Sequence, residues 1–126
     1  MSGKLLLFGF ETPMEVLALV TAVKPLGVEL VSVTRADYGT PLGVLAGEDP
    51  AGKQVPYTGA PLNGRMIVLC GVENRLDELL PVLAAAGAGP DCPKAVLTTH
   101  NRKWTPVTLY GELLRERQAM QRKGKR

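Results

Sequence analysis

The side chains best suited to binding or catalysis gather in one short segment that follows an apolar run. They are Thr98, Thr99, His100, Asn101, Trp104 and Thr105. The segment leaves a predicted strand at 94–99 and enters a predicted helix, where unpaired backbone N–H groups and the helix dipole favour anions. We therefore expect these six residues to bind a small anionic ligand. The alternative is that the same polar groups only satisfy turn and cap hydrogen bonds around a packed Trp104.

Metal, cofactor and thiol chemistry have less support. His100 is the only histidine and no CxxC or HExxH spacing is present, so we predict no metal site and no cofactor. Gly9 and Gly71 belong to no nucleotide-binding motif. A small enzyme that uses Cys92 or His100 with Asp91 stays open as an alternative, and it requires a thiol of depressed pKa. Because no catalytic motif is complete, we expect a protein that is not an enzyme.

Composition indicates one ordinary globular domain spanning 1–126. The chain of 126 residues is 45% hydrophobic and 21% charged, which excludes both disordered and membrane classes. No apolar run approaches the roughly 18 residues that a membrane span needs. The start of the chain lacks the features of a secretory signal, so we expect a cytoplasmic protein without a membrane partner. Two cysteines make no disulfide framework, and Cys70 in an apolar run indicates a buried free thiol.

The positive charge is concentrated at the C-terminus. The net charge is +3, but residues 115–126 hold six basic side chains against the single acidic Glu116, which leaves the rest of the chain slightly negative. A weak nucleic-acid contact through this basic tail is a further alternative. We do not favour it, because the predicted strands carry Leu, Val and Thr where RNA-binding strands carry stacking aromatics.

Two segments of the chain resemble each other. Residues 5–23 align with 67–85 at a constant offset of 62, with six identities in nineteen positions. After a short insertion the similarity resumes at an offset of 65, which pairs Thr40-Pro41 with Thr105-Pro106. We therefore predict an internal repeat of 4–47 and 65–118, separated by a connector at 48–64 that is rich in Pro and Gly.

Each copy reads as strand, helix, strand. An unbroken apolar run that ends near a glycine predicts a buried strand. Thr12-Pro13-Met14-Glu15 is a capping box with proline at the first helical position. In the second copy Asn74 is the expected cap and Pro81 interrupts the helix. Residues 105–114 predict a C-terminal helix whose apolar stripe ends near Arg115.

Two such units in tandem predict an α+β fold. We favour a ferredoxin-like βαββαβ sandwich with both repeat helices on one face of the sheet, plus the C-terminal helix. An open α/β sheet is the alternative, because both arrangements need right-handed βαβ crossings.

The second copy also resembles a known family. It reads K-A-V-L-T at 94–98, then Asn101, Trp104-Thr105 and the amphipathic segment 109–116. In this it is similar to a small bacterial family of uncharacterised proteins, domain of unknown function 3783, over roughly 66–118. The first copy has Ala36 and Gly39 where Asn101 and Trp104 stand, so a shared site would belong to the second half. The resemblance implies no activity.

These observations together lead to one functional expectation. We expect a non-enzymatic regulatory or interaction module that binds a small ligand or a protein partner near Thr98–Thr105 and that can form a homodimer through a sheet edge or face.

Overall fold

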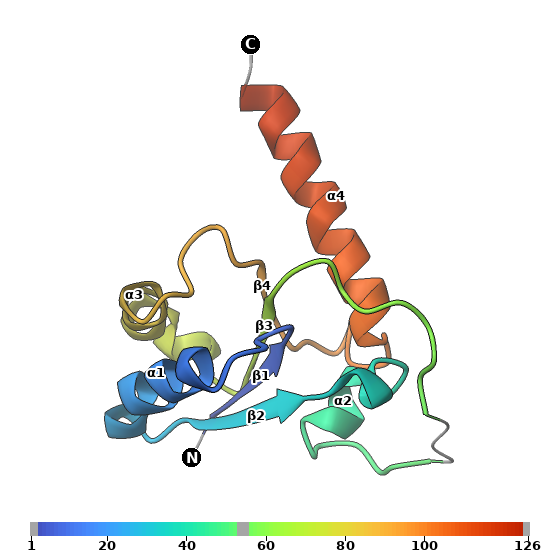
Figure 1. The fold of residues 1–126 in the computed structure, drawn as a ribbon, viewed down its shortest axis with the longest axis horizontal. Coiled ribbons are helices and arrows are strands. Elements are labelled where there is room, and N and C mark those ends of the chain that lie inside the picture. Colours follow the sequence, from blue (N-terminus) through green and yellow to red (C-terminus); the bar gives the residue numbers. More distant parts are fainter. Residues whose placement is uncertain (1–2, 53–55, 125–126) are drawn as a thin grey trace.

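The computed structural model describes residues 3–52 and 56–124, and Figure 1 shows their arrangement. Within these two ranges, four strands and four α-helices alternate. They are β1 (Lys4–Phe8), α1 (Pro13–Val23), β2 (Glu29–Val33), α2 (Leu42–Leu45), β3 (Met66–Cys70), α3 (Leu76–Ala85), β4 (Lys94–Val96) and α4 (Pro106–Gly124). Short 3-10 turns at 24–26, 35–37 and 73–75 adjoin α1, β2 and α3. The protein is thus a mixed α and β structure built on one open sheet.

The sheet has the strand order β2-β1-β3-β4. β1 and β2 are parallel neighbours, as are β3 and β4, while β1 and β3 pair in antiparallel orientation. This arrangement differs from the ferredoxin-like sandwich that we expected, in which another strand lies between the two strands of each βαβ unit. Both orders have β1 and β3 at the centre and differ only in which edge strand each of them pairs with, a choice that the local pattern of a βαβ unit does not make. Every residue of β1 after Lys4 and every residue of β3 is buried, which suits two central strands, whereas β2 carries exposed Glu29 and Ser32 and suits an edge.

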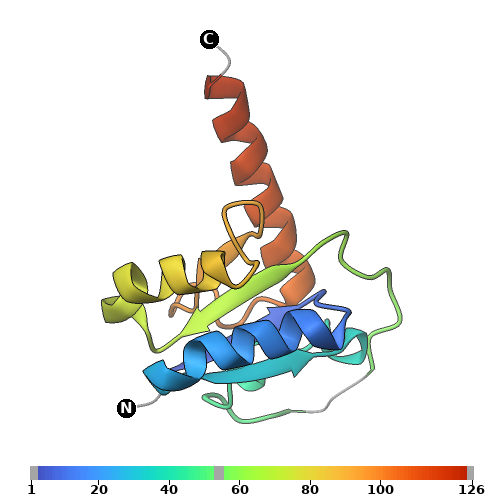
Figure 2. The same ribbon diagram turned by 60° about the vertical axis from the view of Figure 1, so that its left-hand side comes forward.

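Helices cover both faces of the sheet, which is a second difference from the ferredoxin-like sandwich. On one face Leu5 and Leu7 of β1 pack with α1 and α3. On the other face Leu6 and Phe8 pack with α2, Tyr38 and the start of α4. Figure 2 shows α1 and α3 lying side by side along the sheet, with α4 rising from the opposite side of the molecule. The alternation of side chains along a strand therefore supplies two separate cores.

The predicted capping box starts α1. The Oγ1 of Thr12 accepts the N–H of Glu15, and the Glu15 carboxylate accepts the backbone N–H of Thr12. Gly27 ends the following turn in the left-handed conformation, with φ 72°. The expected Asn74 cap is wrong, because Asn74 lies inside the 3-10 turn and α3 begins at Leu76 without a side-chain cap. Pro81 lies within α3, which continues past it to Ala85.

The parts that follow β2 and β4 are unequal. α2 has four residues, whereas α4 has 19. The sequence predicts that the helix weakens beyond Arg115, but the backbone stays helical to Gly124, and Figure 1 shows this end of α4 projecting from the body. Across 3–52 and 56–124, no helix combines the length and apolarity that a bilayer crossing requires.

Candidate functional site

The outer face of α1 exposes an unusual amount of apolar surface. The exposed fraction is 75% for Met14, 59% for Leu17 and 39% for Val20. The helix carries a single charged residue, Glu15, and its carboxylate is paired with Arg65 through a 3.3 Å contact. An exposed helix of a globular protein normally presents polar side chains to water, so an uncharged outer face indicates a surface that contacts something.

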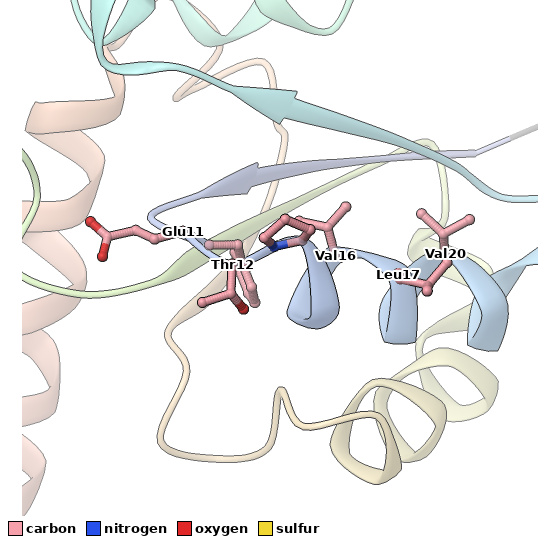
Figure 3. A pocket seen from close by; sticks show the side chains of 7 residues that line it. Glu11, Thr12, Val16, Leu17 and Val20 are labelled. Atoms are coloured by element: carbon pink, nitrogen blue, oxygen red, sulfur yellow. The ribbon is translucent and has the colours of Figure 1, made fainter.

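A shallow groove runs along this helix. Its volume is about 590 Å³, and it is lined by Phe10, Glu11, Thr12, Pro13, Val16, Leu17 and Val20. Figure 3 shows the side chains of Val16, Leu17 and Val20 extending from consecutive turns of α1, whereas Glu11 points away from the helix at the other end of the groove. The floor of the groove is therefore apolar, and its charged group lies at one edge.

Arg65 fixes the end of the groove that adjoins the sheet. Its guanidinium carbon lies 5.0 Å from the centroid of the Phe10 ring, and its nitrogen atoms reach Glu15 at 3.3 Å and Asp91 at 3.7 Å. The cation thus holds the Phe10 loop, α1 and the loop before β4 together. The capping hydrogen bonds and the Arg65 contact each lower the pKa of Glu15, with the Thr12 side chain as the largest cause, so this carboxylate stays charged.

Four of the exposed positions of α1 form one stripe with an internal symmetry, and the exposed Pro13 and Val20 lie beside that stripe. Met14, Leu17, Ala18 and Thr21 are all exposed, and their spacings of three, one and three residues read the same from either end of the helix. An antiparallel second copy of α1 would therefore place Met14 opposite Thr21 and Leu17 opposite Ala18. A twofold interface needs this kind of self-complementary surface.

The predicted segment Thr98–Thr105 is an ordered turn. The Oδ1 of Asn101 accepts the N–H of Thr98 at 2.9 Å, and its Nδ2 donates to the carbonyl of Val96 at 3.0 Å. The Oγ1 of Thr98 accepts the N–H groups of His100 and Asn101. Asn101 is buried, so these hydrogen bonds form a closed local network at the end of β4.

The other predicted site residues extend from that turn to α4. The imidazole of His100 meets Trp104 edge-on, with the ring centroids 5.2 Å apart, and Trp104 packs against the core on the α4 side. The Oγ1 of Thr105 accepts the N–H of Thr108 at 3.3 Å in the first turn of α4. Thr99 is exposed. The structure thus brings Thr98 and Asn101 together, and likewise His100 and Trp104, through turn, cap and ring contacts, while ligand binding by this segment stays a prediction.

The same segment also anchors the first half of the chain. Arg102 reaches Glu48 at 2.7 Å and Asp49 at 3.0 Å. The backbone N–H of Leu42 donates to the carbonyl of Trp104, and that of Gly43 donates to the carbonyl of Arg102. These long-range contacts hold α2 against the turn, and no local sequence pattern predicts them.

The thiols are placed unfavourably for catalysis. Both cysteines are free and buried. Burial raises the pKa of Cys70 to about 12, and burial is also the largest cause of the raised pKa of Cys92. Cys92 precedes β4 and His100 follows it, so the two lie beyond opposite ends of that strand. Within the described ranges, no group of three His, Cys, Asp or Glu side chains is arranged to hold a metal ion.

Sequence reasoning missed the outer face of α1. Its signal is present, because the helix is apolar on nearly every side, whereas a helix that covers one core needs only one apolar stripe. The tertiary structure assigns Leu19 and Val23 to the core and leaves Met14 and Leu17 at the surface.

Comparison with known proteins gives one relationship. A search of curated proteins and a search of solved structures each returned no match. A comparison with models of protein families does give a match, to the second half of the chain. The matched region starts at Arg65, directly before β3, and includes β4 and most of α4. This second-half match was predicted from the spacing of Lys94–Thr98, Asn101 and Trp104. Residues 65–120 of the chain match the family model described as "Domain of unknown function (DUF3783)".

Proposed function

We propose that this protein is a non-enzymatic interaction module that pairs with a second copy of itself through the outer face of α1. The observation that carries the proposal is the uncharged, exposed stripe of Met14, Leu17, Ala18 and Thr21. Burying such a stripe removes apolar surface from water at little polar cost, which favours association.

The second copy is favoured as the occupant for a physical reason. A partner with charged residues at its centre would have to desolvate them against a helix that offers no opposite charge on this stripe. A second α1 offers an equally uncharged surface. When the two helices are antiparallel, their side chains match along the stripe and their dipoles oppose each other favourably.

The other parts of the proposal concern origin and place. We infer that the two strand-helix-strand units derive from one duplicated unit and that the protein works in the cytoplasm, where buried thiols such as Cys70 and Cys92 remain reduced. A thiol enzyme would need a cysteine of lowered pKa, whereas burial raises the pKa of both Cys70 and Cys92. The nucleic-acid alternative is weakened because Arg117 donates to the carbonyls of Pro90 and Asp91.

The test is the oligomeric state as a function of protein concentration. Sedimentation equilibrium of the wild-type chain is expected to give a monomer–dimer equilibrium. Leu17→Asp buries two charges at the centre of the proposed interface and is expected to give monomer at every concentration. Circular dichroism checks that this variant keeps its helix content.

The matched control is Met120→Asp. Met120 is also an exposed apolar residue, at 73%, but it lies on α4 and away from the stripe. This variant should dimerise like the wild type. A wild-type chain that stays monomeric, or two variants that lose dimer equally, would refute the proposed interface.

A further inference from the structure

A second hollow lies where the chain leaves β1 and β2. The two strands are parallel neighbours, so their carboxyl ends lie at the same edge of the sheet. After β1 the chain continues into α1 on one face, and after β2 it continues through Tyr38 to α2 on the other face. In open sheets, adjacent strands whose connections diverge in this way leave a crevice between them, and such crevices commonly bind ligands.

The crevice is large enough for a small metabolite. Its volume is about 430 Å³, within the range usual for small-molecule sites. The lining residues that bear on its chemistry are Phe10, Glu11, Ser32, Thr34, Arg35 and Tyr38, and Pro61 and Leu62 line it as well. Pro61 and Leu62 come from the connector, so this long loop closes one side of the hollow.

The connector is held close to the sheet. A Cβ on Gly9 would lie 2.2 Å from the carbonyl oxygen of Gly64, so the two backbones meet where a side chain has no room. Arg35 extends to the connector as well and donates to the carbonyl of Gly59 through two nitrogen atoms. The walls of the crevice are therefore fixed by contacts from both sides.

Two opposite charges line the crevice without being paired to each other. Glu11 follows β1 and Arg35 follows β2, and no ion pair joins them in the described part of the chain. The Ser32 and Thr34 hydroxyls add hydrogen-bonding groups, and the aliphatic and aromatic side chains supply an apolar wall. The pKa of Tyr38 is raised, mainly by burial and also by the charge of Glu11, so its phenol stays neutral beside the carboxylate.

β3 and β4 form the other parallel pair, and side chains fill the space beyond their carboxyl ends. Beyond β3, Val72 is fully buried, and its Cγ1 lies 2.0 Å from the place that a Cβ on Gly3 would take. Beyond β4, the Asn101 side chain bonds back to Thr98 and Val96. One pair of parallel strands thus ends in a plugged turn, while the other ends in an open crevice with polar and apolar walls.

We propose that this crevice binds a small zwitterion with an apolar skeleton, such as an apolar amino acid. Glu11 accepts hydrogen bonds from the ammonium group, Arg35 donates to the carboxylate, and the skeleton packs against Phe10 and Leu62. Two unlike charges that line one hollow select against a simple anion or a simple amine, because each would leave one protein charge without a counterpart.

The test uses L-phenylalanine and L-leucine as probes on the full chain. Isothermal titration should detect binding of at least one of them, with amide shift changes in ¹H–¹⁵N spectra confined to 9–12, 32–38 and 61–64. Two analogues separate the charges: 3-phenylpropanoate lacks the ammonium group and phenethylamine lacks the carboxylate. Both are expected to bind about tenfold or more weakly than phenylalanine.

Substitutions of Glu11 and Arg35 test whether these two side chains bind the charged groups of the ligand. Glu11→Gln and Arg35→Gln should each weaken binding about tenfold or more. The matched controls are Glu73→Gln, which has the corresponding place after β3, and Arg115→Gln on α4, and both should bind like the wild type. The proposal is overturned if neither amino acid binds, if the shifts fall elsewhere, or if the analogues bind as well as phenylalanine. The titration is repeated on Leu17→Asp, the variant expected to be monomeric. Because Leu17 does not line the crevice, this variant should bind the amino acid as the wild type does, whatever its oligomeric state.

Discussion

Leu6 of β1 and Val68 of β3 are direct partners in the antiparallel pair at the centre of the sheet, and they are 62 positions apart. The same offset aligns the two similar segments of the sequence. A twofold axis between these residues exchanges Leu5 with Ile67 and Leu7 with Leu69, which keeps every pair of this ladder in register. The central strands are thus arranged as a duplicated unit would require, although the helices that end the two halves differ in length by 15 residues.

Gly9→Ala should destabilise the protein. Gly9 has φ 78°, in the left-handed region, and an added Cβ would clash with the Gly64 carbonyl oxygen. We expect the free energy of unfolding, measured by urea denaturation, to fall by about 2 kcal/mol or more. Gly111→Ala is the control, because Gly111 lies in α4 with open space around it. It should gain about 0.5–1 kcal/mol. Equal stability of the two variants would contradict the close approach of the connector to β1.

Asn101→Ala distinguishes a structural turn from a ligand site. It removes the acceptor of the Thr98 N–H and the donor to the Val96 carbonyl in a buried position. The loss should cost about 2 kcal/mol of unfolding free energy in thermal or urea denaturation. Thr99→Ala, at an exposed neighbour, should stay within about 0.5 kcal/mol of the wild type. A stable Asn101→Ala protein would mean that the side chain is retained for some purpose other than the turn.

The buried thiol of Cys70 makes stability depend on alkaline pH. Its pKa is raised from 9.0 to about 12, mainly by burial, so the folded state keeps a proton that the unfolded chain releases. The contribution is complete below pH 9.0 and is lost as pH rises from there towards about 12. The free energy of unfolding of the wild type should therefore fall more steeply over this interval than that of Cys70→Ala. Parallel pH profiles of the two proteins would show that the thiol ionises normally in the fold.

The sequence alone determined the local features. The capping box at Thr12 and Glu15 and the buried apolar runs that open the two copies, 5–8 and 66–69, each depend on residues that are neighbours in the chain. Such signals act within a few residues, and they survive any arrangement of the elements. The family resemblance of the second half was likewise predicted from local spacing, and the family model matches residues 65–120.

Only the tertiary structure decided the strand order, the exposed face of α1 and the crevice beyond β2. A βαβ unit has the same local pattern whether its strands are adjacent or separated, so the ferredoxin-like order and the observed order look alike in sequence. β1 and β3 are buried on both faces, and the chain after β2 covers the face opposite α1 and α3. The same packing decides which apolar residues of α1 are buried and which stay exposed. Burial depends on which elements meet in space, and the spacing of apolar residues along the chain does not show this.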